Sequence, residues 1–312
     1  MPNIQNTLNE GYSLLKNNDI ENYKNECLII LEHILNKNQA FLYTHNDYEL
    51  TKDEYNKFLS IIKERCSKKP LQYILGYQEF MGLNFKVSPD VLIPRQDTET
   101  LVESIISRAP TDKKIFILDI GTGSGCISIS LAKFIKNAIV ISVDISENAL
   151  KMAYSNASLN NVLDRVFFLK SDIFSGIEAL CANSLDYFER EISNLDDVLA
   201  NKFDIIVSNP PYIPLDEMKT LDTGVVNFEP NLALYGGIDG LDFYREITLK
   251  STDFLKNDGI LAFEVGYNQA EAVRDLMAVS YEKIEIIKDY NDINRIVMGS
   301  LREGKKLGNN GI

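Results

Sequence analysis

The feature that most constrains the fold is an alternation that begins at Lys114. From there, short runs rich in β-branched residues alternate with longer stretches of helical periodicity, which is typical of a parallel sheet covered by helices on both faces. The pattern predicts a seven-stranded, doubly wound α/β domain whose last two strands are antiparallel. The predicted strands are 115–120, 139–143, 166–169, 203–208, 259–265, 282–287 and 294–299, and the helices are 125–136, 147–159, 240–256 and 267–279.

The N-terminal part follows a different pattern. Apolar residues recur at helical spacing as far as Lys69, which predicts a small helical domain. Asp19 and Thr51 stand where helix N-caps are expected, and Glu54 completes a capping box with Thr51. Residues 71–93 then alternate apolar and polar side chains, as a β-hairpin does. The predicted domains are therefore 1–69, helical; 70–94, a β-hairpin connector; 95–301, the α/β domain; and 302–312, a flexible tail.

Charge and composition exclude several classes of protein. The net charge of −13 repels phosphate backbones, so we expect no direct binding of nucleic acid. The sequence has no run of about eighteen apolar residues, so we expect no membrane span and a cytoplasmic protein. Four scattered cysteines and two histidines lack the spacing of metal ligands, which argues against a metal site. The acidic stretch 176–201 predicts a solvated helical excursion.

A glycine-rich turn follows the first predicted strand of the α/β domain. The strand ends at Asp119 and Ile120, and Gly121, Gly123 and Gly125 come next, directly before a helix. Glycine permits positive φ and lets the backbone approach a ligand closely, while the helix N-terminus presents free N–H groups to an anion. A dinucleotide fingerprint would need glycine where Cys126 stands, so this is a different turn. A tight turn without a ligand is the alternative.

Acidic residues follow the next two strands. Asp144 can accept hydrogen bonds from both ribose hydroxyls of a bound nucleoside. Asp172 follows the strand after, where a carboxylate commonly meets the adenine amino group, and Ile173 and Phe174 can supply an apolar wall. Either acid alone is more often a helix N-cap. Their common position at carboxyl ends of neighbouring strands favours a nucleoside site.

The strand 203–208 runs into Asn209, Pro210, Pro211 and Tyr212. Two prolines show that the chain leaves the sheet here, and a rigid strand exit is the structural alternative. The Asn209 side-chain oxygen and the Pro210 carbonyl can accept the two hydrogens of a planar NH₂ group, and Tyr212 can pack over that group. Positioning such a nitrogen in line with a methyl sulfonium requires no strong base. We therefore predict Asn209, Pro210 and Tyr212 as catalytic and all four residues as substrate-binding.

Taken together, several sequence blocks resemble the protein-(glutamine-N5) methyltransferases that modify peptide chain release factors. The resemblance covers roughly residues 20 to 300 and depends on the blocks occurring jointly in this order. The blocks lie at 70–80, 92–99, 118–127, 207–213, 228–230, 233–234, 236–241 and 263–266.

The resemblance implies a Rossmann-like methyltransferase domain that binds S-adenosylmethionine and releases S-adenosylhomocysteine. It implies that the helical domain helps to clamp a class 1 release factor, whose Gly-Gly-Gln loop carries the acceptor glutamine, and we expect a monomer. Arg95, Glu99 and Phe80 are expected to line a cleft between the domains or to act as structural hinge residues. The expected cofactor-binding residues are Asp119, Gly121, Thr122, Gly123, Ser124, Gly125, Asp144, Asp172, Ile173 and Asn209.

Two departures from the family pattern and three alternative functions stay open. The acidic segment 178–201 is longer than the family usually carries, and Asn291 stands where the family tends to have glycine. A related class methylates a glutamine of a ribosomal protein with the same tetrapeptide. N6-adenine DNA methyltransferases use a similar motif, although the charge of −13 argues against DNA. The third alternative is a non-catalytic cofactor-binding protein that kept the fold.

Overall fold

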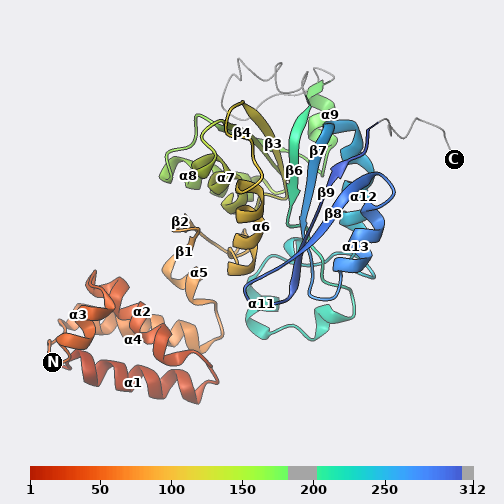
Figure 1. Cartoon of the computed structure of the whole chain (residues 1–312). Helices are drawn as coiled ribbons and strands as arrows, with labels where there is room; N and C mark the ends of the chain where they lie inside the picture. Colours follow the sequence, from red (N-terminus) through yellow and green to blue (C-terminus); the bar gives the residue numbers. More distant parts are fainter. Residues whose placement is uncertain (182–201, 304–312) are drawn as a thin grey trace. The chain divides into compact units, whose positions relative to one another are not determined.

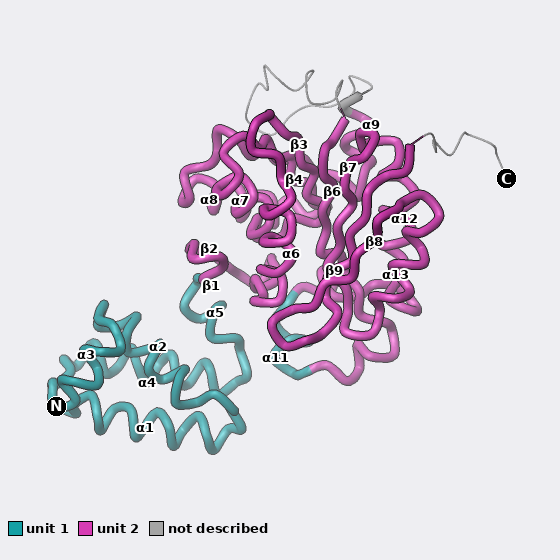
Figure 2. The backbone as a smooth tube through the Cα atoms, viewed as in Figure 1, with its two compact units in different colours: residues 1–77, 222–229 teal, residues 78–221, 230–312 magenta. Residues whose placement is uncertain are grey.

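The computed structural model describes residues 1–181 and 202–303, and these form two compact units (Figure 2). Unit 1 comprises Met1–Tyr77 together with Asp222–Glu229, and unit 2 comprises Gln78–Leu221 and Pro230–Ile312. Most of the predicted acidic excursion and of the predicted tail lies outside the described residues. In the described part of the chain, none of the helices has the length and apolar character needed to span a membrane.

Unit 1 is built from short helices around one core. Leu15, Leu31 and Phe58 are fully buried in that core. Thr51 and Glu54 form the predicted capping box. The prediction of Asp19 as an N-cap is wrong: Asp19 has a φ of 54° and lies in the turn, and the second helix starts only after Asn22. The helices are α1 Ile4–Asn17, α2 Tyr23–Leu35, α3 Gln39–Thr44, α4 Lys52–Cys66, α5 Leu71–Leu75 and α11 Thr223–Phe228.

The predicted hairpin over 71–93 is wrong in its first part. Residues Leu71–Leu75 form α5, because Pro70 starts a helical turn and Gly76, with a φ of 81°, closes it as a left-handed C-cap. The hairpin is confined to β1 Tyr77–Phe80 and β2 Leu83–Lys86. Apolar alternation over five residues cannot distinguish one helical turn from a strand.

Unit 2 contains the seven-stranded sheet, as predicted. The strand order is β5-β4-β3-β6-β7-β9-β8, and β9 pairs antiparallel with both neighbours, whereas the remaining pairs are parallel. The strands are β3 Ile115–Ile120, β4 Ala138–Asp144, β5 Val166–Lys170, β6 Phe203–Ser208, β7 Leu255–Glu264, β8 Tyr281–Lys288 and β9 Asn294–Leu301.

Helices cover both faces of this sheet (Figure 1). Successive residues of β3 point to opposite sides, so Ile117 packs into the core under α6, α7 and α8, whereas Leu118 packs into the core under α12 and α13. This burial on both sides explains why β3 is apolar except at Asp119. The elements of unit 2 besides the strands are α6 Gln96–Ile106, α7 Cys126–Phe134, α8 Glu147–Leu159, α9 Ser175–Cys181, η1 Glu217–Lys219, η2 Asn231–Ala233, α12 Asp242–Phe254 and α13 Ala270–Met277.

The strand order reverses between β3 and β6. The chain proceeds from β3 outward through β4 to β5, and then returns to β6 on the other side of β3. Open α/β sheets bind ligands beyond the carboxyl ends of the strands at such a switch point. At this edge Ile120 pairs with Ser208, and the Ser208 hydroxyl donates to the Ile120 carbonyl at 2.7 Å. The glycine turn and the Asn-Pro-Pro-Tyr segment therefore start from adjacent strand ends.

Candidate active site

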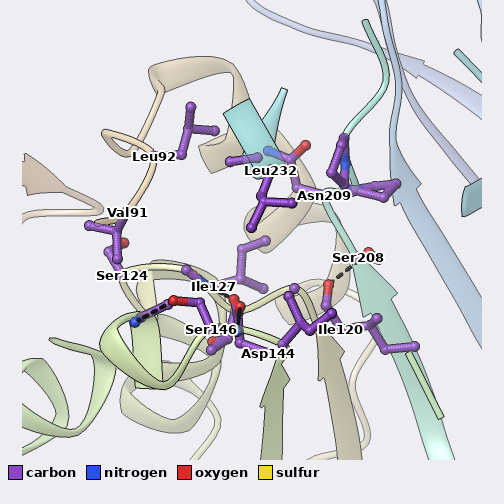
Figure 3. A pocket seen from close by; sticks show the side chains of 18 of the residues that line it. Val91, Leu92, Ile120, Ser124, Ile127, Asp144, Ser146, Ser208, Asn209 and Leu232 are labelled. Carbon is purple, nitrogen blue, oxygen red and sulfur yellow. Dashed lines mark hydrogen bonds between the residues drawn. The ribbon is translucent and has the colours of Figure 1, made fainter. Parts of the chain in front are cut away.

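A cavity in unit 2 lies at this switch point. Residues from seven stretches of the sequence line it, and side chains from four of these stretches, Val91, Ser124, Asp144 and Asn209, surround it in Figure 3. Of the predicted site residues, those lining the cavity are Gly121, Thr122, Gly123, Ser124, Asp144, Asp172, Ile173, Asn209, Pro210 and Pro211. Asp119, Gly125 and Tyr212 are not in this lining, although each is the chain neighbour of a residue that is.

The glycine turn presents open backbone to the cavity. Gly121 has a φ of 75° and Gly123 a φ of 55°, and beyond the glycine and its chain neighbours no described atom lies within 4 Å of where a Cβ would stand on either. A side chain there would be strained by the positive φ and would project into free space in the cavity lining. The turn thus fits a ligand that approaches its backbone closely.

The third glycine of the turn has a packing role. Gly125 has a φ of 82°, and a Cβ there would lie 2.7 Å from Ile129 Cδ1 and 3.0 Å from the Ala153 Cβ. Gly125 therefore lets the first turn of α7 lie directly against α8.

Asp119 stabilises the glycine turn through a buried hydrogen bond. It is fully buried, and its Oδ2 accepts a hydrogen bond from the Thr122 hydroxyl at 2.7 Å. The Thr122 hydroxyl also lies 3.1 Å from Ser128 Oγ, at the start of α7. The carboxyl group of Asp119, which does not line the cavity, thus stabilises the conformation of the turn through Thr122.

Asp119 also makes stability depend on pH. Burial raises its pKa from 3.8 to about 7, so between these values the folded protein binds more protons at Asp119 than the unfolded chain does. The contribution of Asp119 to the free energy of unfolding should therefore fall as pH rises from about 4 to 7 and then level off. We expect Asp119→Asn to weaken this dependence in urea unfolding of the cofactor-free protein at about pH 5 to 8. Asp164→Asn, which alters an exposed carboxylate, should keep the wild-type change of the free energy of unfolding with pH. The same change in Asp119→Asn as in wild type would contradict a raised pKa of Asp119.

Asp144 lies at the end of β4 and contacts the turn directly. Its Oδ2 accepts from the Gly123 N–H and its Oδ1 from the Ser146 N–H, both at 2.9 Å. Desolvation raises the pKa of Asp144, and these backbone hydrogen bonds lower it. Each carboxylate oxygen can accept a further hydrogen bond, which leaves capacity for the hydroxyls of a ribose.

The wall beyond β5 combines an acid with apolar surface. Asp172 is exposed, whereas Ile173 is buried with a φ of 49°. Ile145, which is half exposed, lines the same cavity. Apolar side chains beside a carboxylate suit the flat base of a nucleoside. Phe174 is fully buried and stacks on Phe254, so it belongs to the core and is not part of the cavity wall.

The first three residues of the Asn-Pro-Pro-Tyr segment line the cavity, whereas the tyrosine does not. Asn209, Pro210 and Pro211 line the cavity, and Asn209 Nδ2 donates to Thr98 Oγ1 at 3.3 Å. The Tyr212 ring packs near Gly266, and the Tyr212 carbonyl accepts from Gln269 Nε2 at 2.9 Å. Desolvation raises the pKa of Tyr212 to about 12, so the phenol is neutral. Tyr212 does not cover the cavity in this structure.

The three residues expected at a cleft take different positions. Arg95 lines the cavity. Phe80 is 1% exposed and packs edge-on against Phe85 in the core. The Glu99 carboxylate accepts from the Met81 N–H at 2.6 Å and so fixes the turn of the β1–β2 hairpin.

Sequence reasoning missed a group of polar residues behind Asn209. Thr98 and Glu264 are each 2% exposed, and Arg295 is 9% exposed. They come from three different elements, and Thr98 and Glu264 lie in two of the blocks that carry the family resemblance. The sequence signal that could have identified Thr98 and Glu264 is a hydroxyl or charged residue at the end of a predicted helix or strand, inside one of these blocks.

Comparisons with known proteins agree with this geometry. Residues 6–76 match the family model described as the PrmC N-terminal domain, and residues 111–296 match one described as a methyltransferase domain. The release factor glutamine methyltransferase of Clostridium acetobutylicum is 37% identical over 296 residues, which cover 95% of this chain and 97% of that protein. The protein of the same name from Fusobacterium nucleatum is 39% identical over 292 residues, which cover 93% and 77%.

A solved structure shares the fold. The hMettl16 catalytic domain in complex with MAT2A 3′UTR hairpin 1 gives a TM-score of 0.51 at 15% identity, with 82% of each chain covered. The sheet, its glycine turn and the matched domain thus define a methyltransferase with a Rossmann-like fold. The identity over nearly the whole chain places it in a particular family: the chain belongs to the release factor glutamine methyltransferases.

Proposed function

We propose that this protein transfers a methyl group from S-adenosylmethionine to the side-chain amide nitrogen of the glutamine in the Gly-Gly-Gln motif of class 1 peptide chain release factors. The observation that carries the proposal is that the glycine turn and Asn209–Pro211 line one and the same cavity. The names of the relatives support the choice of protein substrate.

The residues of the cavity fit the cofactor. S-adenosylmethionine supplies an electrophilic methyl group on a sulfonium. Gly121 and Gly123 offer backbone without side chains, Asp144 offers acceptors for ribose hydroxyls, and Asp172 with Ile173 offers a place for the base. S-adenosylhomocysteine would occupy the same residues after transfer.

Asn209 and Pro210 hold the acceptor. A glutamine amide nitrogen is planar and weakly nucleophilic, so its two hydrogens must be held by acceptors that direct it. The Asn209 side-chain oxygen and the Pro210 carbonyl are such acceptors, and the proline ring fixes the direction of the latter. Pro211 borders the same cavity, so it would contact the substrate, and Tyr212 would reach the acceptor only after its ring moves from Gly266.

The partner and the place of action follow from the proposed substrate. Unit 1 matches the PrmC N-terminal domain, and we propose that it contributes to binding of the release factor. Release factors act in translation, so we propose that the enzyme acts in the cytoplasm. We also propose that it acts as a monomer.

A labelled-methyl assay tests the proposal. Purified release factor, ribosomal protein and duplex DNA are offered side by side with labelled S-adenosylmethionine. We expect label on the release factor, located at the glutamine of Gly-Gly-Gln by peptide mass spectrometry. A release factor with Gln→Asn in that motif is the matched control and should stay unlabelled. Label only on the ribosomal protein or only on DNA would refute the proposed substrate.

A further inference from the structure

The sheet register brings a buried carboxyl group beside Asn209. Strands β6 and β7 pair Ser208 with Phe263, so Asn209 and Glu264 follow at adjacent strand ends. Glu264 is 2% exposed, and its Oε2 has no hydrogen-bond partner among the residues that the structure describes. A buried carboxyl group is costly, and one beside a proposed catalytic side chain calls for a reason.

Thr98 connects the two side chains. Asn209 Nδ2 donates to Thr98 Oγ1, and Thr98 lines the cavity from the first turn of α6. Desolvation, together with the charge of Asp97, raises the pKa of Glu264 to about 7, whereas hydrogen bonds from Thr98 and Asn209 and the charge of Arg295 lower it. Thr98, Asn209 and Arg295 thus act on Glu264 as donors or as a positive charge, and Glu264 is the acceptor.

Arg295 fixes the positive charge that faces Glu264. Its Nε donates to Asp289 Oδ2 at 3.2 Å, its Nη2 lies 3.1 Å from Asp97 Oδ2, and its Nη1 donates to the Val265 carbonyl at 3.3 Å. With its donors held from three sides, the guanidinium keeps a constant position behind Glu264 and favours the ionised carboxylate.

We infer that Glu264 is a positioning residue that sets the direction of the Asn209 carboxamide through the Thr98 hydroxyl. In its ionised form the Glu264 carboxylate only accepts hydrogen bonds, so the single Thr98 proton is directed to it. The Thr98 oxygen is then left as an acceptor for Asn209 Nδ2. This keeps the Asn209 oxygen for the acceptor nitrogen, whereas a reversed carboxamide would set an NH₂ group against the substrate NH₂. The inference rests on the proposed function.

Two substitutions of nearly constant volume test this relay. Glu264→Gln replaces a carboxylate, which only accepts, with an amide that can also donate, and Thr98→Val removes the hydroxyl. We expect each to lower kcat for methyl transfer by about 10- to 100-fold, because the acceptor nitrogen is no longer held in line. The Kd for S-adenosylmethionine and the KM for the protein acceptor should change by less than about twofold, since the relay acts through the direction of the Asn209 side chain. Thr98→Ser, which keeps the hydroxyl, should recover most of the activity lost in Thr98→Val.

The control and the double variant separate positioning from general damage. Thr100 lies on the same helix and is also buried, and its hydroxyl has no partner among the described residues, so Thr100→Val should keep the wild-type kcat. The double variant Glu264→Gln with Thr98→Val should be no slower than the slower single variant, because both break one chain of hydrogen bonds. If Glu264→Gln does not fold, comparison of Thr98→Val with Thr98→Ser still tests whether the Thr98 hydroxyl positions Asn209.

Failure of the inference and failure of the proposed function give different results. All variants are compared with wild type on whichever of the three acceptors wild type methylates. Wild-type kcat in Thr98→Val and Glu264→Gln, additive losses in the double variant, or losses confined to Kd or KM would overturn the relay only. A wild-type protein that methylates none of the acceptors would overturn the proposed function and the relay with it.

Discussion

Replacing Asn209 with alanine should lower kcat for methyl transfer by about 100- to 1,000-fold, the range seen when one preorganised group is removed from a reacting centre. The substitution removes the side-chain oxygen that would hold one hydrogen of the acceptor amide, while the Pro210 carbonyl stays. The glycine turn and Asp144 do not depend on Asn209, so the Kd for S-adenosylmethionine should change by less than about threefold. Single-turnover transfer to the release factor and calorimetric titration of the cofactor measure the two quantities.

A matched control for this variant is Asn257→Ala. Asn257 is exposed near the beginning of β7, at the opposite end of the strand from Glu264. It should retain wild-type transfer and cofactor affinity. Turnover in Asn209→Ala equal to that of the control would exclude the assigned role of Asn209.

The second large effect is expected on cofactor affinity. Asp144→Ala should weaken binding of S-adenosylmethionine about 10- to 100-fold, because hydrogen bonds to a charged group contribute about 1.5–3 kcal/mol each. The variant also frees the Gly123 N–H, which the Asp144 carboxylate now holds. Asp144→Asn should lie between wild type and alanine, since its amide oxygen can still accept from that N–H but carries no charge. Calorimetric titration with S-adenosylmethionine measures the Kd of wild type, Asp144→Ala and Asp144→Asn.

Asp164→Ala provides the comparison for Asp144. Asp164 carries the same charge, and its side chain is 73% exposed. Its removal changes the net charge equally and should leave the Kd unchanged. A normal Kd in Asp144→Ala would show that the end of β4 does not hold the ribose.

The sequence predicts β3, β6 and α8 to the residue, and the reason is physical. β3 and β6 are mostly apolar runs, buried on both faces except at Asp204 of β6. Each is followed by residues that leave the sheet: Gly121 after β3 and Pro210 after β6. Helix α8 begins after Ser146, whose hydroxyl accepts from the Ala149 N–H, a signal that is local in sequence. The glycine turn and the Asn-Pro-Pro residues were likewise predictable, because strand order alone brings their strand ends together.

Contacts between distant blocks were not predictable from local pattern. The relay of Thr98 and Glu264 depends on how α6 packs over the end of β7, and no periodicity records that packing. Tyr212 was expected over the acceptor, yet its ring packs near Gly266, because the direction of a side chain after two prolines depends on tertiary contacts. Helix α5 was missed because one helical turn and a short strand share the same apolar spacing.

The division of the chain into units has a practical consequence for dissecting the protein. Residues 222–229 belong with the N-terminal helices, and a Cβ on Gly224 would lie 2.8 Å from the Lys68 carbonyl, so α11 sits tightly on that unit. The polypeptide therefore passes between the units three times, near residues 77, 221 and 229. A protease cut after residue 77 would leave α11 on the C-terminal fragment and its packing surface on the N-terminal one. A truncated protein that starts at residue 78 would carry α11 without that surface, whereas a fragment ending at residue 77 would lack α11.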